Sequence, residues 1–152
     1  MTTVIERPAL PTKRDEAWRY APHRTLGELS FGPPVDLGEP IPAELDDQIP
    51  DLDGPRIVVI NGVVDTHRSR LESPDGVRLS TLADEIAAGS ELAALHSDVT
   101  DPADAYVAVN AEFGVDGAVV DVADRVVVDS PIHIVDVEVP DETRNASCTG
   151  VV

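Results

Sequence analysis

The side chains that most often carry catalysis or bind metal ions are few in this chain and far apart. Its four histidines are His23, His67, His96 and His133, and its single cysteine is Cys148. No two of them have the spacing of a Cys-x-x-Cys or His-x-x-x-His metal site. A single cysteine also excludes a disulfide within the chain. We therefore predict no catalytic residue, no metal ligand and no cofactor-binding residue.

The individual candidates favour structural roles. His133 alternates with valines, which predicts a partly buried, hydrogen-bonded imidazole. Cys148 has only Arg144 nearby in sequence as a positive charge that would activate its thiol. The acidic pairs Asp46-Asp47 and Asp51/Asp53 lie in a proline-rich stretch, where rigid placement for acid–base work is not expected. These carboxylates are predicted to be solvated charge.

The charge of the chain excludes several classes of partner. The 152 residues carry a formal net charge of −18, and it is uneven: residues 1–25 hold five basic and three acidic side chains, and the rest carries −20. A surface this acidic repels nucleic-acid phosphates and anionic lipids. Neither an apolar signal segment nor an apolar run of about 18 residues occurs, so we expect a cytoplasmic protein.

Three stretches are expected to position these residues: an N-terminal helix and proline-rich acidic arm (1–55), a small α+β region (56–116) and the start of a β core (117–152). Thr12 and Asp15 predict a capped short helix over 12–20. Trp18 is expected to pack this helix onto the chain's own core, the alternative being a partner-docking face shared with Tyr20 and neighbouring arginines. Residues 31–55 contain six prolines and are expected to run over the surface, with at most a helical turn at 43–47.

The middle of the chain has the clearest local signals. Asn61-Gly62 between two β-branched runs predicts a hairpin over 56–65. Two short helices are predicted over 80–96, the first capped by Ser80 or Thr81, with Leu82 and Ile86 on one face, and ended by Gly89. A third is predicted over 102–113, with Gly114 after its end.

From Gly117 the chain reads as short strands: GAVVDVA, RVVVD and PIHIVDVEV. Stacked short strands need neighbours to cover their edges. We therefore expect the front part of a longer structure. Val135, Val137, Val139, Val151 and Val152 are expected to face water or an unpaired edge, with weak protection after Gly117 and with oligomers or a disordered tail.

Four stretches in order carry a resemblance to a known family: LPTKRDEAWRY at 10–20, VVINGVVD at 58–65, LSTLADEI with ELAALH at 79–96, and DAYVAVNAEFGVDGAVVDVADRVVVDSPIHIV at 104–135. Together they resemble the N-terminal region of the SufB/SufD family of iron–sulfur cluster assembly scaffolds. The short N-terminus and the DEAWRY form favour a SufD-like member.

The resemblance implies an α+β N-terminal region leading into the first rungs of a right-handed parallel β-helix. It implies a scaffold subunit rather than an enzyme, with a SufB-like subunit and a SufC-like ATPase as partners. The iron–sulfur cluster would be handled by the full complex, with no ligand from this segment.

Two other classes of function are compatible with parts of the sequence. The acidic charge would suit a non-catalytic module that binds a basic protein. A fragment of a polysaccharide-acting β-helix protein is less compatible, because aromatic residues make up only 3% of the chain.

Overall fold

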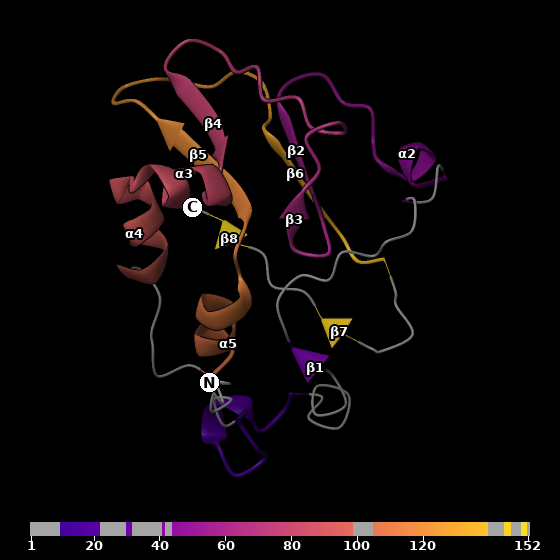
Figure 1. The fold of residues 1–152 in the computed structure, drawn as a ribbon, viewed down its shortest axis with the longest axis vertical. Helices are drawn as coiled ribbons and strands as arrows, with labels where there is room; N and C mark the ends of the chain where they lie inside the picture. The colour runs from indigo at the N-terminus through magenta and orange to yellow at the C-terminus, as the bar shows by residue number, and fades with distance from the viewer. Residues whose placement is uncertain are drawn as a thin grey trace.

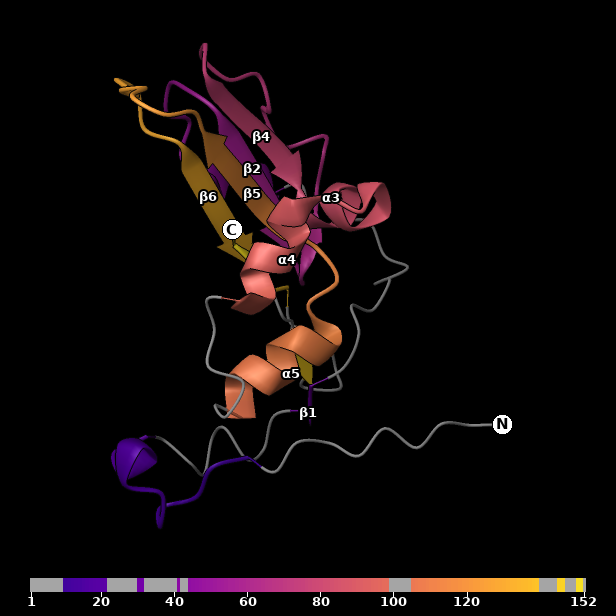
Figure 2. The same ribbon diagram turned by 90° about the vertical axis from the view of Figure 1, so that its left-hand side faces the viewer.

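The computed structural model describes residues 10–21, 30–31, 41, 44–98, 105–139, 145–146 and 150–151. His23, Cys148 and the predicted helix start at 101–104 lie outside these residues. In chain order the elements are η1 (Glu16–Trp18), β1 (Ser30–Phe31), α2 (Glu44–Gln48), β2 (Arg56–Ile60), β3 (Val63–Val64), β4 (Val77–Thr81), α3 (Leu82–Ala88), α4 (Glu91–Asp98), α5 (Ala105–Phe113), β5 (Gly117–Val122), β6 (His133–Val137), β7 (Asn145–Ala146) and β8 (Gly150–Val151). In both views α5 lies between the long strands and η1 (Figures 1 and 2).

The predicted hairpin is confirmed and forms the first sheet, of order β3-β2-β6. Asn61 and Gly62 have φ values of 48° and 81°, which is the backbone of a type I′ turn. On its other side β2 pairs in parallel with β6, from Arg56 opposite His133 to Ile60 opposite Val137. Asn61 continues this ladder, because its side-chain amide bonds both backbone groups of Val139. Segments more than 70 residues apart in sequence are thus joined side by side.

The second sheet has the order β4-β5-β8. β4 and β5 pair antiparallel from Val77 opposite Val122 to Thr81 opposite Ala118. Ala118 and Val119 are fully buried and belong to a paired strand, so this strand is better covered than the expectation of weak protection after Gly117 implies; that protection stays a prediction for hydrogen exchange. The sequence gives no local sign of the pairing with β4, and that pairing makes β5 a central strand.

β2 separates two apolar clusters because neighbouring residues of a strand point to opposite faces. Ile57 and Val59 face the second sheet and pack in one cluster with Val77, Leu79 and Ala118. Val58 and Ile60 face the other way and pack against Leu45 and Ile49. β2 is therefore buried on both sides.

The second cluster corrects two expectations. Val135, Val137 and Val139 pack against it, so their side chains do not face water as expected. β6 itself is an outer strand among the described strands of its sheet, since it pairs with β2 on one side. Leu45 and Ile49 are buried, so the helical turn in the proline-rich stretch packs into the protein instead of only running over its surface.

The helices follow their predicted caps with two differences. The Thr81 side chain accepts a hydrogen bond from Asp84 N–H, and Gly89 ends α3 at φ 64°. Of the predicted apolar face of α3, Leu82 is buried, but Ile86 is 53% exposed and Glu85 is buried instead. Gly114 ends α5 without a positive φ. A Cβ there would lie 2.6 Å from the carbonyl oxygen of Asn110, so close approach explains this glycine.

The N-terminal segment forms a 3-10 turn in place of the predicted longer helix. Asp15 accepts hydrogen bonds from both the N–H and the hydroxyl of Thr12, which is half of the predicted capping box. Trp18 packs on α5 with its ring centroid 4.9 Å from that of Tyr106. Trp18 thus packs half-buried against the chain itself, as predicted. Tyr20 points outward and is 88% exposed.

Replacing Trp18 tests whether this aromatic contact holds the N-terminal turn. Because the ring is partly buried against Tyr106, Trp18→Ala should lower the free energy of unfolding by about 1–2 kcal/mol. The measurement is urea denaturation followed by far-UV circular dichroism. Tyr20→Ala is the matched control, and equal midpoints for the two variants would contradict the anchoring role.

Candidate functional site

Within the described residues, the structure does not bring the candidates from the sequence together; His23 and Cys148 lie outside these residues. His67 lies exposed in the turn after β3, and His133 begins β6 half-buried. Among the described residues, no group of three or more His, Cys, Asp or Glu side chains is placed to hold a metal ion. None of the helices in the described part of the chain has the length and apolar character needed to cross a bilayer.

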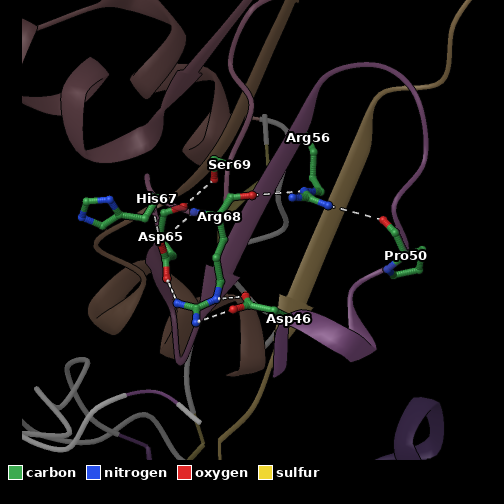
Figure 3. Close-up of polar contacts among 7 residues, drawn as sticks. All are labelled: Asp46, Pro50, Arg56, Asp65, His67, Arg68 and Ser69. Carbon is green, nitrogen blue, oxygen red and sulfur yellow. Dashed lines mark hydrogen bonds and ion pairs between the residues drawn. The ribbon is translucent and has the colours of Figure 1, made fainter. Parts of the chain in front are cut away.

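The densest polar cluster is instead the turn that follows the hairpin (Figure 3). The Asp65 carboxylate accepts hydrogen bonds from the N–H groups of His67 and Arg68 at 2.9 and 3.0 Å. The Ser69 hydroxyl donates to the Asp65 carbonyl and accepts from Val58 N–H. The turn is thereby fastened to the middle of β2.

Arg68 lies between two carboxylates. Its guanidinium bonds Asp65 through Nη1 at 2.7 Å and Asp46 of α2 through Nε at 2.6 Å. The bonds to Asp65 and then Asp46 raise the pKa of Arg68. Burial of the Asp65 carboxylate raises its pKa, but the hydrogen bonds and charge of Arg68 outweigh burial, so this pKa lies below its ordinary value. At neutral pH both groups are charged.

Two further arginines reach the same proline-rich stretch. Arg70 pairs with Asp51 at 3.3 Å and donates to the carbonyl of Leu52. Arg56 donates to the carbonyl of Pro50 at 3.4 Å (Figure 3). The Asp46 and Asp51 side chains are 59% and 88% exposed, as the prediction of solvated charge expects, but each also pairs with an arginine that the sequence did not indicate.

A second cluster surrounds Glu85 on α3. Its carboxylate accepts a hydrogen bond from the Ser80 hydroxyl at 2.6 Å and is bonded by the Arg78 guanidinium. Hydrogen bonds from Ser80, Ser90 and Arg78, with Ser80 the largest effect, lower the pKa of Glu85 to about 2. This side chain joins β4, α3 and the start of α4.

A third buried carboxylate, Asp116, joins both sheets. It accepts hydrogen bonds from the N–H groups of Val64, Ala83 and Gly117, at 2.9, 3.1 and 2.8 Å. Ala83 lies in the first turn of α3, whose unpaired N–H groups favour a carboxylate. Asp116 therefore fixes the hairpin, α3 and β5 to one another.

These contacts fit structural and binding roles better than acid–base chemistry. Asp65, Glu85 and Asp116 are each held by arginines or backbone N–H groups, and each stabilises the packing of separate segments. The sequence prediction missed Arg68 and Asp116 because Asp46, Val64 and Ala83 are brought to them from distant parts of the chain. It missed Glu85 because its partners, although within seven residues, lie on β4 and before α4 rather than on its own helix. The Asp65–Arg68 spacing of three residues was the one local signal available.

Glu85 should make the free energy of unfolding depend on pH. Its pKa falls from 4.5 to about 2 in the folded chain, so its stabilisation is fully present above pH 4.5 and is lost as the pH falls through 2. Glu85→Gln should therefore lower the urea midpoint at pH 7, and the gap to the parent should shrink near pH 2. Glu91→Gln, at an exposed position, is the control. If Glu85→Gln lowered the urea midpoint by the same amount at pH 7 and near pH 2, the stabilising role of the Glu85 carboxylate would be contradicted.

Comparison with known proteins identifies the family. A family model described as the SufBD protein N-terminal region matches residues 2–134. No curated protein matches the chain. The matched range includes the hairpin, all the helices and β5, and thus every residue of the three polar clusters. The chain therefore belongs to the SufB/SufD family of iron–sulfur cluster assembly proteins.

Proposed function

We propose that this chain acts as the N-terminal part of a SufD-like scaffold subunit in iron–sulfur cluster assembly. The observation that carries the proposal is the family match over residues 2–134. On this proposal the protein acts in the cytoplasm with a SufB-like subunit and a SufC-like ATPase. It performs no catalytic step itself, and this segment supplies no ligand to the cluster.

The strand pairing supports the structural side of the proposal. Each of the last three strands pairs in parallel with an earlier one: β6 with β2, β7 with β1, and β8 with β5. Parallel pairing between successive turns of chain is the arrangement that a β-helix repeats. We propose that β6, β7 and β8 belong to the start of the right-handed parallel β-helix expected over 117–152.

The polar clusters support a scaffold role over an enzymatic one. Asp65, Glu85 and Asp116 are each bonded by several groups of the chain itself. A carboxylate that serves as a general base needs a pKa near the working pH. The pKa of Glu85 is about 2, far below that range.

Co-purification tests the proposal. The tagged chain is expressed together with the SufB-like and SufC-like proteins of its source, captured at 500 mM salt and analysed by mass spectrometry. Recovery of both proteins is expected. Capture of neither, with a basic protein bound only at low salt, would favour the acidic binding module and contradict the scaffold role.

A further inference from the structure

Residues 44–53, here called the acidic arm, are held on the protein in the way a bound peptide is held. Its helix α2 places Leu45 and Ile49 in the apolar cluster with Val58 and Ile60. Its polar atoms are bonded by Arg56, Arg68 and Arg70. Three of the five arginines between residues 26 and 139 thus contact this one segment.

The surface under the arm is fixed by contacts that do not involve the arm. Arg68 is held by Asp65, whose side chain is 10% exposed, whereas Asp46 on the arm is 59% exposed. Arg56 and Arg70 exchange two backbone hydrogen bonds, at 2.9 and 2.7 Å. The Arg56 side chain is also held from within the surface, because its Nε donates to the carbonyl of Arg68 at 3.1 Å. Arg56 and Arg68 are therefore oriented before the arm binds, and a preorganised site loses less entropy on binding.

The arm itself has little that keeps it in place. α2 is only five residues long, and helices this short are unstable without packing. Two apolar side chains and exposed ion pairs hold it, and exposed ion pairs contribute little in water. The contacts within the surface are thus rigid, whereas the contacts between the arm and the surface are weak.

We propose that the acidic arm is a displaceable strap, and that the surface beneath it binds an acidic amphipathic helix of a partner protein. The partner helix would carry two apolar residues four positions apart, as Leu45 and Ile49 are. It would carry a carboxylate directly after the first, as Asp46 is, to meet the guanidinium of Arg68. The bound segment should be acidic, because Arg56, Arg68 and Arg70 border the apolar face and attract negative charge. The proposal does not depend on the role in cluster assembly.

The test separates the arm from its surface by charge reversal. The probe is a fluorescent peptide of residues 41–53, IPAELDDQIPDLD. In the full chain with Asp46→Lys, the arm is repelled by Arg68 while the surface stays intact. The matched control is Asp47→Lys, a neighbouring exposed residue. The tethered arm acts at roughly millimolar effective concentration, so the parent chain should exclude the free peptide.

We expect fluorescence anisotropy to show at least tenfold tighter peptide binding to the Asp46→Lys chain than to the parent or the Asp47→Lys chain. Binding should weaken with salt, and adding Arg68→Gln should reduce it at least tenfold. A Leu45→Ala chain, which loosens the arm without a charge change, should also bind the peptide.

Three results would overturn the proposal: no binding to either loosened chain, equal binding to the Asp46→Lys and Asp47→Lys chains, or binding unchanged by Arg68→Gln. Dimerisation of the Asp46→Lys chain in place of peptide binding would also overturn it, because the surface would then serve a second copy of this chain.

Discussion

The structure depends on one strand that is buried on both faces. Ile57, Val58 and Val59 have no exposed surface, and Ile60 has 6%. Burying a Val or Ile side chain contributes about 1.5–3 kcal/mol, so these four neighbouring residues supply much of the stability available to so small a domain. An antiparallel strand with one solvated face would alternate with polar residues, and β2 does not. Its composition therefore requires apolar cover from both directions.

Each polar cluster can be understood as a means of keeping that cover in place. Asp116 ties the second sheet and α3 to the hairpin. Arg68 ties the acidic arm, which covers the opposite face, to the turn after β3. In a chain of net charge −18, each arginine is scarce, and most in this region bridge segments that are distant in sequence. Most other carboxylates in the described part of the chain are exposed, and like charges on a surface oppose non-specific association.

The features that followed from the sequence are those whose causes are local. The Asn61-Gly62 turn requires positive φ values, and Thr81 and Gly89 bound α3 through contacts within a few residues. Long-range pairing was not predictable in this way. The burial of Ala118 comes from its pairing with Thr81, and no short motif marks it. The packing of α2 was underestimated because the prolines on either side of it obscured the spacing of Leu45 and Ile49. Glu85 could not be singled out because no motif marks its contacts with Ser80 and Arg78.

The family places the chain among iron–sulfur cluster assembly proteins. Its architecture is that of a rigid structural unit rather than of a mobile one. A doubly covered strand beside three parallel pairings gives a rigid start on which further strands can stack. Native-state hydrogen exchange measures this rigidity most directly, because it reports the stability of each segment separately. The amides of Val58 and Val59 should exchange only through global unfolding, more slowly than those of α4. Exchange of β2 as fast as α4 would contradict the central position of this strand.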